Sequence, residues 1–214
     1  MSENIEIREL LEDVELRANE QGEEVLTGYA IVFNRESEDL GGFKEIIERS
    51  AVDAVNFSNT VATFNHNANN VLGRVPKTMT YSVDDRGVKV EIKLPDTTAG
   101  NDVRELVKRG DVKGMSFTFR IAQDGDKWDK PTGNGKYYKR TVTKIEAIPE
   151  LGPVVFPAYR ATDVTVAKRA LGVLKDAEER EVTDALQRER EKEEIRITNY
   201  HRALKLKIRG RIKH

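Results

Sequence analysis

The sequence predicts a mainly β, α+β fold: an antiparallel, barrel-like core with short flanking helices, followed by a charged helical C-terminal tail. Short runs of alternating apolar and polar residues, separated by turn residues, recur through the first 160 residues. Helical spacing of apolar residues is confined to short pieces of that region. Beyond residue 167 the density of charged residues rises. We therefore expect one folded domain, residues 1–167, and a tail, residues 168–214.

The clearest strand covers residues 88–94, where four apolar residues alternate with three charged ones. The preceding residues 84–87, Asp-Asp-Arg-Gly, have the composition of a tight turn. Residues 81–83 are therefore expected to form the other arm of a β-hairpin. The same alternation predicts further strands at residues 25–33, 61–65, 115–121, 137–145 and 154–156.

One short helix is predicted at residues 102–109. Asp102 and Glu105 form a capping-box pattern at its start, and Gly110 follows its end. Its apolar residues share one face: Val103, Leu106 and Val107. Residues 43–55 are a second helical candidate.

Two segments allow more than one interpretation. Residues 125–135 are polar and rich in glycine, and we interpret them as a hairpin loop. Trp128 in that loop would cover either the edge of the core or a substrate groove. From residue 204 onward apolar and basic residues alternate, and the conformation of this end is left open.

Charge divides the chain after Ala167. Residues 168–214 contain 14 Lys or Arg against 9 Asp or Glu, whereas residues 1–167 contain 22 against 28. Apolar residues between 171 and 186 recur at helical spacing among these charges. This part of the tail is therefore predicted to be a solvated amphipathic helix.

The composition excludes several kinds of site. The chain has no cysteine, which removes thiol nucleophiles, disulfides and thiolate metal sites. It contains no apolar run near the roughly 20 residues that span a bilayer, and it begins with an acidic segment that does not resemble a signal peptide. We expect a soluble protein in which covalent catalysis would use Ser, Thr, Lys or a carboxylate.

His66 is the only histidine of the predicted β domain, because His201 and His214 lie in the tail. An imidazole titrates closest to neutral pH, so it is the natural general base for a hydrolase of this size. The alternative is a structural or surface histidine in a polar, Asn-rich loop.

Ser116 is the candidate nucleophile, in the run Gly-Met-Ser-Phe-Thr-Phe-Arg that begins at Gly114. In a regular strand its side chain would lie opposite the bulky apolar face and point to a polar surface or cleft. Gly114 would let a substrate backbone approach and leave nearby amides free to bind an oxyanion. The alternative is an ordinary surface serine, and the run is not the nucleophile elbow of α/β-hydrolases.

A third group would orient the histidine. Glu146 and Glu150 flank a short apolar segment just before the run of residues 151–156. Either carboxylate could face the site, and either could be a surface glutamate.

Four segments together resemble the prohead protease family of tailed bacteriophages, which is related in fold to the herpesvirus assemblins. They occur in the family's order and extend over residues 25–160. The segments are LTGYAIVFN (26–34), FNHNANNVLGRV (64–75), LPDTTAGNDVRELVKRGDVKGMSFTF (94–119) and ELGPVVFPAY (150–159).

The resemblance implies a serine endopeptidase with a barrel-like core. His66 and Ser116 correspond to the family's catalytic pair, and Glu150 to the third member, with Glu146 as the fallback. No metal or organic cofactor is implied. The chain departs from the family at residues 48–51, Glu-Arg-Ser-Ala in place of Pro-Gly-Ala-Phe, and at Gly152, where the family has a serine.

The resemblance also implies partners and a place of action. The expected substrates are the scaffolding portion of the major capsid protein and the chain itself, and the portal protein is a further candidate partner. The protease would self-associate inside the assembling prohead, in the cytoplasm of the bacterial host, without a membrane. Residues 168–214 would then bind the scaffold region or be removed by self-cleavage.

Two other functions fit parts of the sequence. A scaffold or assembly chaperone could retain the protease fold without its activity. The basic end, with six Lys or Arg between residues 202 and 213, could bind nucleic acid. We rank nucleic-acid binding last, because the β domain is net acidic.

Overall fold

A computed structural model describes residues 5–11, 14–155 and 165–211, with the side chains described up to residue 199. Contacts between Cα atoms divide the chain into two compact units, Met1–Val166 and Ala167–His214. Each unit is described by itself below. No helix in the described part of the chain is both long and apolar enough to cross a membrane.

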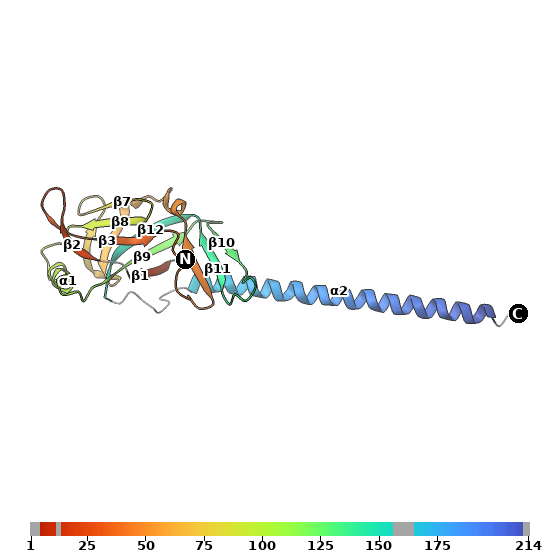
Figure 1. Cartoon of the computed structure of the whole chain (residues 1–214). Coiled ribbons are helices and arrows are strands. Elements are labelled where there is room, and N and C mark those ends of the chain that lie inside the picture. The colour runs from red at the N-terminus through yellow and green to blue at the C-terminus, as the bar shows by residue number, and fades with distance from the viewer. Residues whose placement is uncertain (1–4, 12–13, 156–164, 212–214) are drawn as a thin grey trace. The chain divides into compact units, whose positions relative to one another are not determined.

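The described strands of unit 1 form three sheets (Figure 1). The largest has the order β1 (Glu6–Leu10), β9 (Gly114–Ile121), β12 (Ile145–Val154), β5 (Val61–Phe64) and β6 (Asn67–Arg74). A second has the order β2 (Glu15–Ala18), β3 (Glu24–Val32), β8 (Gly87–Ile92) and β7 (Met79–Val83). The third has the order β10 (Asp126–Asp129), β11 (Tyr138–Val142) and β4 (Phe43–Ile47). Short 3₁₀ helices cover Arg49–Val52 and Phe57–Asn59.

The prediction of a mainly β fold is confirmed, whereas the barrel-like arrangement is not confirmed and the pairing of the described strands is antiparallel only in part. None of the three sheets closes on itself. Two strand pairs are parallel, β12 with β5 and β11 with β4. Each of these pairs joins strands that are far apart in the sequence, and parallel pairing requires such a long crossover. The alternation of residues within a single strand does not reveal which distant strand will pair with it in parallel.

The hairpin predicted around residues 84–87 is confirmed as β7 and β8, paired in antiparallel register. The helical candidate at 43–55 is wrong, because this segment forms β4 and then a 3₁₀ turn. Side chains of β4 alternate between buried and partly exposed, with Glu45 among the buried ones. Because Glu45 is charged but buried, the positions of the apolar residues alone do not show that buried and partly exposed side chains alternate in β4.

The helix α1 (Thr98–Arg109) begins four residues before its predicted start. Its N-cap is Thr97, whose side chain accepts a hydrogen bond from the amide of Gly100 at 3.3 Å. The capping box proposed for Asp102 and Glu105 is therefore wrong. The predicted end is confirmed: Gly110 has a φ of +79°, a left-handed conformation that favours glycine.

The segment predicted as one strand at 137–145 is divided between β11 and β12, and β12 ends where the strand predicted at 154–156 was expected to begin. Phe156 lies outside the described residues. The predicted loop at 125–135 contains the strand β10. Trp128 of β10 packs against Phe43, with ring centroids 5.0 Å apart, so it covers the core edge of the three-stranded sheet.

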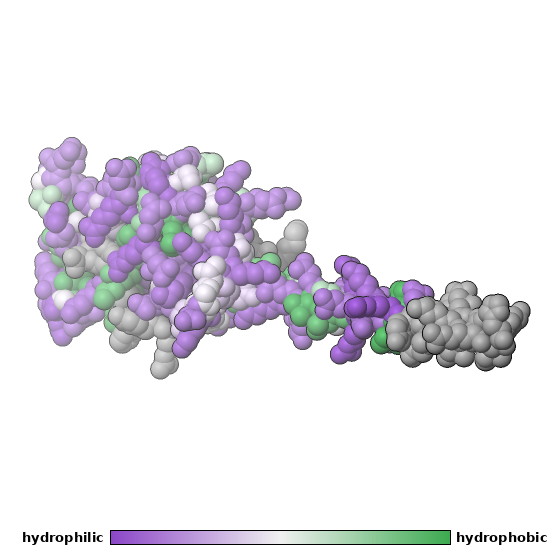
Figure 2. Space-filling model, turned by 45° about the vertical axis from the view of Figure 1, so that its right-hand side comes forward, coloured by the Kyte–Doolittle hydropathy of each residue, from purple (hydrophilic) through white to green (hydrophobic). Residues whose placement is uncertain are grey.

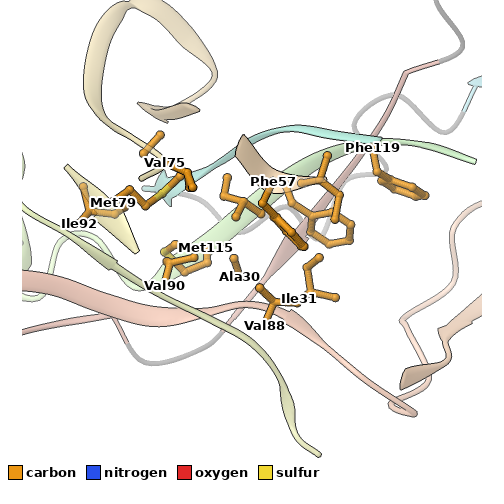
Figure 3. Packing of buried hydrophobic residues seen from close by; sticks show 14 of the residues in the cluster. Ala30, Ile31, Phe57, Val75, Met79, Val88, Val90, Ile92, Met115 and Phe119 are labelled. Carbon is orange, nitrogen blue, oxygen red and sulfur yellow. The ribbon is translucent and has the colours of Figure 1, made fainter. Parts of the chain in front are cut away.

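The core of unit 1 lies between the sheets and collects apolar side chains from distant segments. Figure 3 shows side chains from β3, β7, β8 and β9 brought together around Met115 and Phe57. Full burial of a Val, Leu, Ile, Phe or Met side chain contributes about 1.5 to 3 kcal/mol to the stability of the folded protein. This packing fixes β9, which carries Ser116, against the second sheet.

Unit 2 contains the long helix α2 (Thr165–Arg211), which continues through the basic end. Exposed apolar side chains do not share one face: Val173 and Val182 are nine residues, or 2.5 turns, apart and lie on opposite sides. Figure 2 shows apolar patches dispersed among hydrophilic residues on the described part of this helix. The predicted helix is thus observed, and Val173 adds an apolar side chain on the side opposite to Val182 of the predicted apolar face.

Candidate active site

His66 lies in the two-residue turn that joins β5 to β6. Phe64 and Asn67 form the last strand pair, and Asn65 and His66 between them have φ values of +53° and +56°. Two consecutive positive φ values characterise the type I′ turn of tight hairpins. Asn and His are enriched in this left-handed region among non-glycine residues. The turn therefore fixes the backbone that carries the imidazole.

Asn65 attaches this turn to β12. Its amide donates a hydrogen bond to the carbonyl of Pro153 at 3.1 Å, and its Oδ1 accepts one from the amide of Val155 at 3.0 Å. The hairpin that presents His66 is thereby held to the end of the strand that carries Glu150.

Ser116 lies in the middle of β9, opposite Glu9 of β1 on one side and Gly152 of β12 on the other. Its side chain is fully buried, so it does not lie on an open surface, and its Oγ faces the polar side chain of His66. The alternation is correct for the apolar face of β9, but the opposite face is covered as well, since Thr118 is also buried.

The three predicted residues come together in one hydrogen-bonded chain. Nε2 of His66 lies 2.6 Å from Oγ of Ser116, and Nδ1 lies 3.0 Å from Oε2 of Glu150. An ionised carboxylate only accepts hydrogen bonds, so Nδ1 carries the proton and donates it to Glu150. In the neutral imidazole this leaves the lone pair of Nε2 to accept the hydroxyl proton of Ser116.

Glu146 is not part of this chain. Its carboxylate lies 3.5 Å from Nε of Arg120, and its side chain is 60 % exposed. Glu150 is therefore the one of the two candidate glutamates whose carboxylate contacts His66.

Glu150 has a second donor, Thr63 of β5, whose Oγ1 donates a hydrogen bond to Oε1. Burial by itself would raise the pKa of Glu150, but the hydrogen bonds from His66 and Thr63 outweigh it and hold the pKa below its ordinary value. The carboxylate thus stays ionised beside the imidazole. Sequence analysis did not identify Thr63, which has no distinctive local motif.

Gly152 explains how closely β5 approaches β12. A Cβ atom at this position would lie 2.1 Å from the carbonyl oxygen of Thr63, far inside contact distance. The backbone of β5 therefore leaves no room for a side chain at residue 152. The hydrogen bond to the carboxylate comes from Thr63.

The N-terminal strand β1 also contributes to the site. Ser116 Oγ is 3.0 Å from the backbone carbonyl of Arg8, to which it can donate a hydrogen bond. Oε1 of Glu9 lies 4.0 Å from Nε2 of His66. The sequence does not single out this strand, because apolar and polar side chains alternate only over residues 5–8.

A buried cluster of charged side chains holds β1 in place. Arg8 contacts Glu45 and Glu6 at 2.7 Å, and Arg140 contacts Glu6 at 2.7 Å and Glu45 at 3.0 Å. Arg140 also pairs with Asp126 at 2.7 Å. The cluster joins β1 to all three strands of the small sheet, and so fixes the carbonyl of Arg8 beside Ser116.

The charges in this cluster stabilise one another. Burial alone would raise the pKa of Glu6, but hydrogen bonds and charges of Arg140 and Arg8 lower it below its ordinary value. Burial would lower the pKa of Arg8, yet Glu45 and Glu6 raise it instead. Both shifts favour the charged forms of Glu6 and Arg8, and a buried charge that loses its partner is costly, so the cluster is sensitive to the removal of a member.

The arrangement is that of a nucleophile, a base and an orienting carboxylate. Within the residues that the structure describes, no group of three or more His, Cys, Asp or Glu could hold a metal ion.

Comparison with known proteins gives one result. A family model described as Caudovirus prohead serine protease matches residues 12–176 of the 214. No curated protein and no solved structure matches the chain. The expected fold relation to the herpesvirus assemblins therefore stays a prediction.

Proposed function

Because the chain belongs to the caudovirus prohead serine protease family, it is a serine peptidase of capsid maturation, and we propose that Ser116, His66 and Glu150 perform its catalysis. The observation that carries this proposal is the continuous hydrogen-bonded chain from Ser116 through His66 to Glu150. A surface histidine or an ordinary strand serine has no need of such a chain.

The proposed reaction is acyl transfer. His66 Nε2 accepts the proton of Ser116 as Oγ attacks a peptide carbonyl, and Glu150 stabilises the imidazolium through the Nδ1 proton. The imidazolium then donates its Nε2 proton to the leaving amine. A water molecule, deprotonated by His66, hydrolyses the acyl-enzyme and restores the hydroxyl of Ser116.

The carbonyl of Arg8 belongs to the cycle as an alternative acceptor. Ser116 has one hydroxyl proton and two acceptors within 3.0 Å, Nε2 of His66 and the carbonyl of Arg8. When His66 is protonated, Nε2 donates to Oγ and the hydroxyl proton points to Arg8. When His66 is neutral, the proton points to Nε2. The serine hydroxyl thus points away from His66 in the imidazolium form and towards it in the neutral form.

The substrate proposed is the scaffolding portion of the major capsid protein, together with the chain itself. The family description supports a prohead substrate. The setting is the interior of the assembling prohead in the host, where the protease would self-associate and could contact the portal protein. We retain residues 168–214 as a proposed scaffold-binding or self-processed tail, since the family match ends at residue 176.

Co-expression with the capsid protein tests this function. Ser116→Ala should abolish trimming of the capsid protein, with a rate loss of about 10⁴ to 10⁶. Ser82→Ala, at an exposed serine of β7, is the matched control and should trim normally. Normal trimming by Ser116→Ala would instead favour the scaffold or chaperone role.

A further inference from the structure

The two oxygens of the Glu150 carboxylate bind two different residues of the same hairpin. Oε2 accepts from Nδ1 of His66 at 3.0 Å, and Oε1 accepts from Oγ1 of Thr63. The terminal torsion of a glutamate side chain is broad, so one hydrogen bond alone leaves the carboxylate free to rotate. A donor on each oxygen fixes its plane.

Thr63 is itself fixed. It is 6 % exposed, and the pairing of β5 with β6 shifts register on both sides of it. Its carbonyl lies against Gly152 so closely that no side chain fits there. Residues 61 and 62 of β5 pair directly with Glu150 and Leu151 of β12. The backbone that carries the hydroxyl therefore cannot move away from Glu150 without moving the strand.

Thr63 also favours the charged form of Glu150. The side chain of Glu150 is 17 % exposed, so solvent supplies little of the hydrogen bonding that a carboxylate needs. A hydroxyl that donates a hydrogen bond to the carboxylate stabilises the ionised form more than the protonated form, which lowers the pKa of Glu150.

We propose that Thr63 is a positioning residue that holds the Glu150 carboxylate in line with Nδ1 of His66. This inference builds on the proposed function, because it assigns a role around the same histidine. Thr63 acts through Glu150 and contacts neither Ser116 nor the reacting atoms.

Thr63→Val tests the proposal, since it keeps the shape of the side chain and removes the donor. Thr63→Ser keeps the donor and should restore function. The matched control is Thr60→Val: Thr60 is also buried and also bonds to β12, but through the carbonyl of Ile148 at 2.6 Å. Thr60→Val therefore removes a comparable buried hydrogen bond but leaves the contacts of Glu150 unchanged.

Two readouts are needed, and the first is kinetic. Thr63→Val should lower kcat about 10-fold to 100-fold with little change in KM, the loss expected for a hydrogen bond to a charged group. Thr63→Ser and Thr60→Val should stay within about threefold of the parent. A Thr63→Val enzyme with the parent kcat, or a Thr63→Ser enzyme as slow as Thr63→Val, would overturn the proposal.

The second readout does not depend on activity. The pKa of Glu150, followed by carboxyl ¹³C NMR, should rise in Thr63→Val and stay at the parent value in Thr60→Val. The Nδ1 proton resonance of His66 should shift or broaden in Thr63→Val alone. Unchanged NMR signals in Thr63→Val would refute the role of Thr63 even if the chain proved to have no protease activity. An inactive parent with the expected NMR changes would refute only the proposed function.

Discussion

Glu9 lies directly opposite Ser116 in the antiparallel pairing of β1 with β9, and its Oε1 is 4.0 Å from Nε2 of His66. The preceding residue, Arg8, presents its carbonyl to the serine hydroxyl. The strand that makes both contacts precedes residue 12, where the family match begins. The site of this chain thus extends into its N-terminal strand.

Replacement of Glu9 by glutamine should slow the reaction. The variant keeps the shape of the side chain and removes a negative charge that favours the imidazolium. The side chain of Glu9 is only 8 % exposed, and a charge pair at 4 Å is worth about 1 kcal/mol even in bulk water, so the rate should fall by about fivefold or more. The rate of fluorophosphonate labelling at neutral pH measures this effect. A variant that labels as fast as the parent would show that the Glu9 charge does not act on His66.

Replacement of Arg8 by methionine should destabilise the fold strongly. It leaves Glu6 and Glu45 buried with Arg140 as the remaining partner in the cluster. Breaking a buried ion pair in this way costs about 3 to 5 kcal/mol. Urea unfolding measures the loss. Arg17→Met, at a surface pair with Glu15, is the control and should cost less than about 0.5 kcal/mol.

Substitutions of Asn65 should reduce stability and labelling rate according to how well each new residue tolerates positive φ and keeps the hydrogen bond to Val155. Asn65→Ala loses the bond to Val155 and places an alanine at positive φ, where the conformation alone costs about 1 to 2 kcal/mol. Asn65→Gly removes the cost of the positive φ but still loses the hydrogen bond to Val155. Asn65→Asp can keep both the conformation and the hydrogen bond. We expect stability and labelling rate to rank aspartate above glycine and glycine above alanine. If alanine equals asparagine in both measurements, the turn does not hold His66.

Acid should weaken the fold through Glu6 and Glu150. Their pKa values are below the ordinary value, so the unfolded chain binds more protons than the folded protein. This contribution to stability is complete above the ordinary glutamate pKa of about 4.3 and is lost as the pH falls through the lower folded values. Urea unfolding from pH 7 downward should show the loss.

The matched variants for this pH series are Glu6→Gln and Glu146→Gln. Glu6→Gln should be less stable at pH 7 but lose less on acidification, because one of the responsible groups is gone. Glu146→Gln, at the exposed alternative glutamate, should keep the parent slope. A parent whose stability does not change between pH 7 and pH 3 would contradict the account.

Local alternation was sufficient to predict β8 and β9, because each has one face whose side chains are all apolar. It failed for β4, where Glu45 is buried and balanced by Arg8 and Arg140, which are 37 and 95 residues away. A charge with distant partners looks like a surface residue in the sequence. The same limit applies to Thr63 and to the carbonyl of Arg8, whose contacts exist only once β5, β12 and β1 have paired.

The candidate triad was likewise only partly predictable from the sequence. Composition isolated His66, and alternation identified the strand of Ser116, but 50 residues separate the two. The resemblance to a family, not the spacing, favoured Glu150 over Glu146. The structure brings the three side chains together, while their catalytic roles remain predictions.

Labelling of the protein with a fluorophosphonate probe, followed by peptide mapping, tests whether Ser116 is the nucleophile. We expect covalent modification at Ser116 that is lost in Ser116→Ala and strongly reduced in His66→Ala, with Ser82→Ala unaffected. Modification at another residue, or no modification of a folded sample that assembles with capsid protein, would contradict the assignment of Ser116 as the nucleophile.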